Sequence, residues 1–145
     1  MFEIIDISSG AVVIIFVVVV VIFRGRITDS LDKRYFTRRW AKLTKLCVDR
    51  KLWYQAIIDA DELLDEALKQ RHFKGKTTGE RLVSAQHYFS SNDTVWFSHK
   101  LKNKITEQDH KKLNKKETLE ALASFKLALK DLGALSSDRR TKAKS

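Results

Sequence analysis

The chain lacks the residues on which several protein classes depend. Its 145 residues include no proline and a single cysteine, Cys47, so an intramolecular disulfide is impossible, as suits a reducing cytoplasm. Its five glycines form no phosphate-binding loop, because Gly75 and Gly79 flank lysine and threonine without P-loop spacing. The four histidines lack paired ligands one helical turn away. We therefore expect no metal, no other cofactor and no nucleotide motor.

The chain also lacks internal repeats and strand-like alternation, and it has a single long apolar run. Residues 7–23, ISSGAVVIIFVVVVVIF, contain no charged side chain. As a helix they span about 26 Å, and Ile4 and Ile5 extend this toward the roughly 30 Å of a bilayer core. A valine run suits a strand in water, but lipid satisfies no open strand edge. The run therefore predicts one transmembrane helix, because the alternative, a buried core helix, rarely keeps apolar residues on every face.

Charges on the two sides of this run predict its orientation. Before it lie only the acidic residues Glu3 and Asp6, whereas the first basic residues come after it: Arg24, Arg26, Lys33, Arg34, Arg38 and Arg39. The positive-inside rule then places the N-terminus outside and residues 24–145 in the cytoplasm. A signal peptide would begin with basic residues and end at a small-residue cleavage site. We therefore expect an uncleaved single-pass anchor in the cell membrane.

The part of the chain after this run is strongly basic. The whole chain carries a formal charge of +10 and Glu3 and Asp6 contribute −2 of it, which leaves +12 for residues 24–145. Basic residues concentrate in 24–51, 98–116 and 134–145, whereas 59–66 is acidic. Beside a bilayer, such a surface favours anionic lipid headgroups as a partner, with RNA as the second class.

Length and composition predict three segments. Residues 1–27 form the membrane anchor, and residues 28–135 are enough for one compact cytoplasmic domain with its own core. Residues 136–145 have no apolar side chain larger than alanine, so we expect a disordered basic tail.

Hydrophobic periodicity predicts an all-α domain, an up-and-down bundle of four to five helices. The first helix, over 32–47, has a single apolar face made of Phe36, Trp40, Leu43 and Cys47. A break at 48–51 separates it from a helix over 53–70, whose stripe is Trp53, Ile57, Ala60, Leu64 and Ala67 or Leu68. The three tryptophans of the chain lie at or beside such stripes, which favours packing over base stacking.

Three further helices follow. A short one over 82–89 comes after Thr77 and Glu80, which have capping-box spacing, and the next, over 94–105, follows a polar cap at 91–93. The last helix begins at a cap formed by Asn114 and Glu117 and ends at Gly133. Its predicted core stripe is Leu119, Leu122, Phe125, Leu129 and Leu132.

Two carboxylates lie one turn apart on the second helix, beside its apolar stripe. Asp61 and Asp65 in this position could support acid–base chemistry, but ion pairs with a lysine or with Arg81 explain them more simply. We therefore expect these carboxylates to make ion pairs, and Lys102 is the partner that we predict for Asp61 or Asp65.

A group of polar residues gathers on the helix over 94–105. At 100° per residue Trp96, His99 and Asn103 share one face. ADELLDEAL (60–68), GKTTGERL (75–82) and WFSHKLKNKIT (96–106) resemble an uncharacterised bacterial family of membrane-anchored helical proteins, over residues 52–135. That family's arginine, asparagine and histidine motif is similar to the motif of HEPN domains, which are helical bundles in many RNases and RNA-binding modules. The resemblance implies an HEPN-like bundle with a degenerate site at His99, Lys102, Asn103 and Glu107.

The sequence departs from this motif at two positions. Lys102 stands where the family has arginine, and Glu107 stands where it has histidine. A carboxylate repels phosphate and has the wrong pKa for the proton transfer that the histidine performs. Two other pairs have the motif's spacing, which chance explains in so basic a chain: Lys104 with His110, and Arg81 with His87. We therefore expect no catalytic residue.

Two functional hypotheses remain. The first is a non-catalytic cytoplasmic interaction module on a membrane anchor, which binds a protein partner or a second copy of itself. The second is an HEPN-like domain that binds or cleaves RNA. A buried and mutually paired set of polar residues would favour the first hypothesis, whereas an open groove with converging basic groups would favour the second.

Overall fold

The computed structural model describes residues 10–21, 31–108 and 113–137, which belong to two compact units, Met1–Ser30 and Leu31–Ser145. In the first unit residues 10–21 form a helix with exposed apolar side chains. Across the described ranges no helix is both long and apolar enough to cross a membrane. The rest of the predicted anchor, 1–9 and 22–27, and residues 138–145 of the predicted tail lie outside the described residues.

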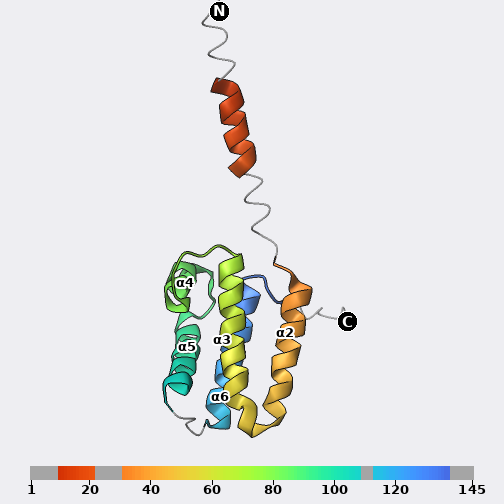
Figure 1. The fold of residues 1–145 in the computed structure, drawn as a ribbon, viewed down its shortest axis with the longest axis vertical. Helices are drawn as coiled ribbons and strands as arrows, with labels where there is room; N and C mark the ends of the chain where they lie inside the picture. The colour runs from red at the N-terminus through yellow and green to blue at the C-terminus, as the bar shows by residue number, and fades with distance from the viewer. Residues whose placement is uncertain (1–9, 22–30, 109–112, 138–145) are drawn as a thin grey trace, which may run out of the picture. The chain divides into compact units, whose positions relative to one another are not determined.

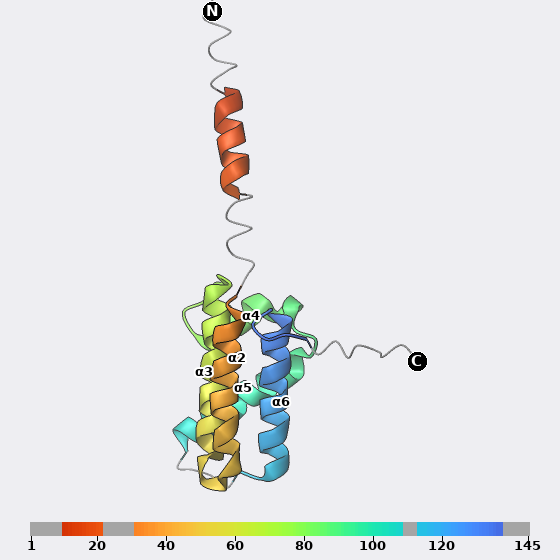
Figure 2. The same cartoon turned by 90° about the vertical axis from the view of Figure 1, so that its right-hand side faces the viewer.

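The second unit is a bundle of α-helices, as the hydrophobic pattern predicts (Figures 1 and 2). No strand occurs in the described part of the chain. The helices are α2 Lys33–Lys45, α3 Trp53–Gln70, α4 Thr78–Ala85, α5 Asn92–Glu107 and α6 Lys115–Asp131. Short 3-10 turns lie at Leu46–Val48, Arg50–Leu52 and Gln86–Tyr88. Helix α3 packs against the other four helices, and α5 packs against α6.

Polar side chains cap the starts of α2, α4 and α6. The Asp32 carboxylate accepts hydrogen bonds from two backbone N–H groups at the start of α2, and the Asn114 side chain accepts one from Glu117 N at the start of α6. Thr77 and Glu80 form the predicted capping box at α4. At α5 the predicted side-chain cap is not formed, because the N-cap residue, Ser91, makes no side-chain capping hydrogen bond.

Two helices end in the same backbone motif with different residues. After α6, Gly133 has φ 78°, and the N–H of Ala134 reaches the Leu129 carbonyl at 2.8 Å. After α3, His72 has φ 61°, and the N–H of Phe73 reaches the Leu68 carbonyl at 3.1 Å. Both are Schellman caps, for which glycine is the usual residue. The glycine cap predicted at Gly133 is confirmed, whereas the cap at His72 carries no such sequence signal.

Among the described residues, the core of the second unit is built from side chains of this unit. Its buried apolar residues run from Leu31 to Leu135, and the largest fully buried side chains are Phe36 and Phe125. Leu119, a residue of the stripe predicted for the last helix, is 55 % exposed instead, and Val83 on α4 is 52 % exposed. Leu119 shares the outer face of α6 with Lys126, seven residues later, and Val83 points away from the face that buries Leu82. Residues 31–145 therefore have the core they need to fold without the first unit.

Candidate functional site

The three sequence segments that carry the family resemblance meet in one place. Residues 60–68 belong to α3, residues 75–82 to the loop before α4 and to α4 itself, and residues 96–106 to α5. Where these elements pack together, six polar side chains form what we call the polar cluster: Asp61, Asp65, Arg81, His99, Lys102 and Asn103.

Asp61 is the centre of this cluster. It is buried, with 1 % of its surface exposed, although it lies on a helix that is otherwise apolar on this face. One carboxylate oxygen, Oδ1, lies 2.8 Å from His99 Nδ1. The other, Oδ2, lies 3.3 Å from the Lys102 ammonium. Both oxygens of this buried carboxylate are therefore engaged by α5, and Lys102 pairs with one of its two predicted partners.

His99 is held on several sides. Its ring is buried, with 7 % of the residue exposed, and can donate from Nδ1 to Asp61 while Nε2 faces the Asn103 amide at 3.5 Å. The Trp96 ring meets it edge-on, with centroids 6.0 Å apart. A methyl group placed on Gly79 would lie 3.9 Å from Nε2, so the first turn of α4 closes over the same edge of the ring.

Arg81 and Asp65 make the second connection, from α4 to α3. The guanidinium forms two parallel hydrogen bonds to the carboxylate, at 2.7 and 2.9 Å, and a third to the Gly75 carbonyl at 2.7 Å. Burial opposes the charge on Asp65, but Arg81 and the Lys69 ammonium hold its pKa below the ordinary value. The pair therefore contributes its stability at neutral pH and loses it only as pH falls through that lowered pKa.

Glu107 does not join the polar cluster. It is exposed at the last residue of α5, and no hydrogen bond or ion pair connects it to the six clustered side chains. Three of the four predicted site residues, His99, Lys102 and Asn103, thus come together, and the position that holds histidine in the family stays apart. Of the two other basic–histidine pairs, one includes His110, outside the described residues, and the other separates buried Arg81 from exposed His87.

The contact that sequence reasoning missed is the one between Asp61 and His99. Each residue was singled out, Asp61 for an ion pair and His99 for the degenerate motif, but nothing in the spacing joins positions 38 residues apart. The available signal was indirect: both residues lie on the core-facing sides of their helices. A second interhelical contact, from Tyr35 on α2 to Glu66 on α3 at 3.0 Å, was also not predicted.

The polar cluster is arranged to hold helices together. Lys102 and Arg81 each already face a carboxylate, at 3.3 and 2.7 Å, so little positive charge remains for a phosphate. Within the described residues no three histidine, cysteine or carboxylate side chains converge on a point where they could bind a metal ion. Asp61 connects α3 to α5 and Asp65 connects α3 to α4, so charge neutralisation and helix positioning are the roles that this geometry performs.

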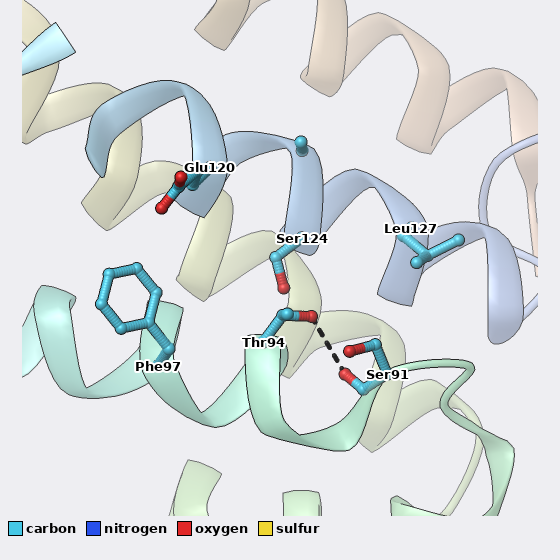
Figure 3. A pocket seen from close by; sticks show the side chains of 7 residues that line it. Ser91, Thr94, Phe97, Glu120, Ser124 and Leu127 are labelled. Carbon is cyan, nitrogen blue, oxygen red and sulfur yellow. Dashed lines mark hydrogen bonds between the residues drawn. The ribbon is translucent and has the colours of Figure 1, made fainter. Parts of the chain in front are cut away.

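A groove between α5 and α6 is a second candidate site (Figure 3). Its volume is about 440 Å³, and its apolar side chains include Phe97 and Leu127, which are 43 % and 39 % exposed. Ser124 points its hydroxyl into the space between the two helices. That oxygen is buried and has no hydrogen-bond partner among the described residues. This groove, lined by Ser91, Thr94, Phe97, Glu120, Ala123, Ser124 and Leu127, is called the α5–α6 groove below.

No protein-family model matches the chain, and no curated protein or solved structure is significantly similar to it. The likeness to membrane-anchored bacterial proteins and to HEPN domains thus remains a prediction from residues 52–135. The functional conclusion depends on the polar cluster, the α5–α6 groove and the distribution of charge.

Proposed function

We propose that this protein is a non-catalytic helical interaction module, tethered to the cell membrane by residues 7–23 with its bundle in the cytoplasm. The observation that carries the proposal is the state of the polar cluster. Asp61, Arg81 and His99 are at least nine-tenths buried, and each is bound by another side chain of the cluster. Catalytic groups need access to a substrate, so paired and buried groups favour a structural role.

The tether is supported by the first unit and by the flanking charges. Side chains around the whole helix over 10–21 are apolar and exposed, with Ile14 66 % and Phe16 68 % accessible. Such a helix has no polar face to turn toward water, whereas lipid satisfies every side of it. The charge difference between the two flanks sets the direction of insertion.

A protease-protection experiment tests the orientation. When protease is added outside intact cells, residues 24–145 are expected to survive, because the positive flank keeps them in the cytoplasm. The measurement is immunoblotting of a C-terminal tag, with permeabilised cells as the control in which the tag is digested. Digestion of the tag in sealed cells would show that the orientation is wrong.

The α5–α6 groove is the surface that we assign to a protein partner, specifically to an amphipathic helix of that partner. Such a helix offers an apolar stripe of the kind that Phe97 and Leu127 can cover. Glu120, which also lines the groove, favours a basic residue beside the stripe.

Substitutions in the groove test this assignment. Phe97→Asp and Leu127→Asp should each reduce capture of a protein partner by the full chain about tenfold or more, because a carboxylate cannot be desolvated against an apolar stripe. The matched control is Val83→Asp, which changes an exposed valine on α4 outside the groove. Cross-linking in native membranes, affinity capture and quantitative mass spectrometry measure the loss. Equal loss in all three variants, or in none, would contradict the assignment.

One observation favours the RNA hypothesis as a second candidate. The Asp61–His99 pair is the arrangement that orients a histidine for proton transfer, and Lys102, with 22 % of its side chain exposed, lies next to it. Nuclease treatment during capture separates the two functions, since a protein complex survives it and an RNA-mediated one does not. Cleavage of RNA by the wild type that is lost in Lys102→Ala, with stability unchanged, would make the chain an enzyme.

A further inference from the structure

Helix α2 presents a one-sided basic surface. Six of its thirteen residues are lysine or arginine and none is acidic. Its inner side buries Phe36 and Leu43 and packs Trp40 against the core. Five of the six basic residues are exposed, namely Lys33, Arg34, Arg38, Lys42 and Lys45. These five define what we call the α2 basic face.

Four of these five residues form a single stripe, and Lys33, the first residue of the helix, lies about 100° from Arg34 around the axis. At 100° per residue, Arg34, Arg38, Lys42 and Lys45 fall within about 80° of the helix circumference. Within the described residues none of the five is in an ion pair, whereas the sixth, Arg39, lies 3.8 Å from Glu66 and bonds the Tyr35 hydroxyl. The small side chains of Thr37, Ala41 and Thr44 flank the stripe and are exposed as well. The side chains of the α2 basic face are therefore available to pair with anions from outside the described bundle.

The first turns of α2 also form a hollow suited to a phosphate group. A shallow cavity of about 430 Å³ is lined by Lys33, Arg34, Thr37, Arg38 and Ser136. Three cations and two hydroxyl-bearing side chains line it, and no carboxylate does. Guanidinium and ammonium groups beside hydroxyl donors are the groups with which proteins bind phosphate.

We propose that the α2 basic face binds the headgroup phosphates of anionic phospholipids in the membrane to which the chain is tethered, an inference that rests on the proposed tether. Nine residues, 24–32, separate Phe23, the end of the apolar run, from Lys33, so ten residue steps keep the start of α2 within about 36 Å of the membrane surface. Tethering at this distance raises the effective concentration of lipid headgroups at the basic face.

The aromatic residues of α2 favour lipid over RNA as the occupant. Proteins that bind single-stranded RNA combine a basic groove with exposed aromatic rings on which bases stack. On α2 the aromatic side chains turn inward: Phe36 is fully buried, and Tyr35 and Trp40 pack against the core. The outward surface of α2 carries basic side chains and small ones, and such a surface suits a layer of phosphate headgroups better than stacked bases.

The proposal predicts charge-dependent vesicle binding by residues 31–145, the unit with its own core. This fragment should bind phosphatidylcholine vesicles that contain phosphatidylserine, and moderate salt should release it. The triple variant Arg34→Gln, Arg38→Gln and Lys42→Gln should bind at least about tenfold more weakly. The matched control neutralises three exposed lysines of α5 and α6, Lys100, Lys104 and Lys126, and should keep most of the affinity. Circular dichroism melting verifies that each variant is folded.

Each outcome of this vesicle experiment supports or overturns the proposal. Equal loss in the two triple variants, equal binding to pure phosphatidylcholine, or binding by the wild type that resists high salt would each overturn it. Tighter binding to a single-stranded RNA than to the anionic vesicles would replace lipid by RNA. Carbonate extraction of the full chain tests the tether separately: a chain that stays in the membrane while its fragment ignores anionic vesicles contradicts only this inference.

Discussion

Replacing Asp61 with alanine is expected to lower the free energy of unfolding by about 3 to 5 kcal/mol, because it leaves the groups around a buried carboxylate without their partner. His99 loses the acceptor at 2.8 Å, and Lys102 loses its counter-charge at 3.3 Å. Thermal and denaturant unfolding measure the change. The matched control is Glu62→Ala on the same helix, an exposed carboxylate whose removal should change stability by less than about 0.5 kcal/mol.

A double-mutant cycle shows whether the pair with Lys102 acts as a unit. Lys102→Ala alone should cost less than Asp61→Ala, since the Lys102 side chain is 22 % exposed and the Asp61 side chain only 2 %. The double variant should cost less than the two single variants together, by about 0.5 to 3 kcal/mol. Additive costs would show that the two residues stabilise the fold independently. None of these variants should change an RNase assay.

A second large effect is expected at Gly75. A Cβ atom at this position would lie 2.7 Å from the backbone nitrogen of Arg81 and 2.8 Å from Glu80 Cβ, and backbone atoms cannot yield as a flexible side chain can. Gly75→Ala must therefore push the loop away from α4, which weakens the hydrogen bond from Arg81 to the Gly75 carbonyl. We expect a loss of about 2 to 3 kcal/mol in the free energy of unfolding.

Gly79 provides the comparison for this variant. There an added Cβ would meet Trp96 and His99 at 3.7 and 3.9 Å, which are ordinary contact distances. Because alanine favours a helix over glycine by about 1 kcal/mol, Gly79→Ala should be neutral or mildly stabilising. If the two alanine variants unfold at the same denaturant concentration, the close approach of Gly75 to α4 has no energetic consequence.

The fold was predictable to the extent that local patterns determine it. Phe36 and Leu43 reveal the buried side of α2 through helical spacing, and the caps at Thr77 and Asn114 mark helix starts because capping is a contact between near neighbours. Leu119 was assigned to the core on hydrophobicity, and the structure exposes it. Periodicity places a residue on an arc of the helix, whereas the neighbouring helices decide how wide the buried arc is.

The candidate site was predictable only in part, since its contacts span long sequence separations. A charge beside an apolar stripe implies a partner, and that reasoning led from Lys102 to the acidic edge of α3. It could not show that His99 shares the same carboxylate, because that depends on the depth at which α5 crosses α3. The α5–α6 groove was missed for the same reason: Phe97 and Leu127 are ordinary helix residues until the two helices are placed side by side.

The shallow seating of α2 has a mechanical consequence. Helix α2 buries only two side chains, whereas α3 buries eight and α6 seven, so α2 is the long helix with the fewest buried anchors. It is also the first helix of its unit, which means that any tension arriving through the N-terminal chain enters the bundle there. Load would then act first on the Tyr35–Glu66 contact and on Phe36 and Leu43. Under force α2 would therefore separate from α3 before the core around Phe125 yields.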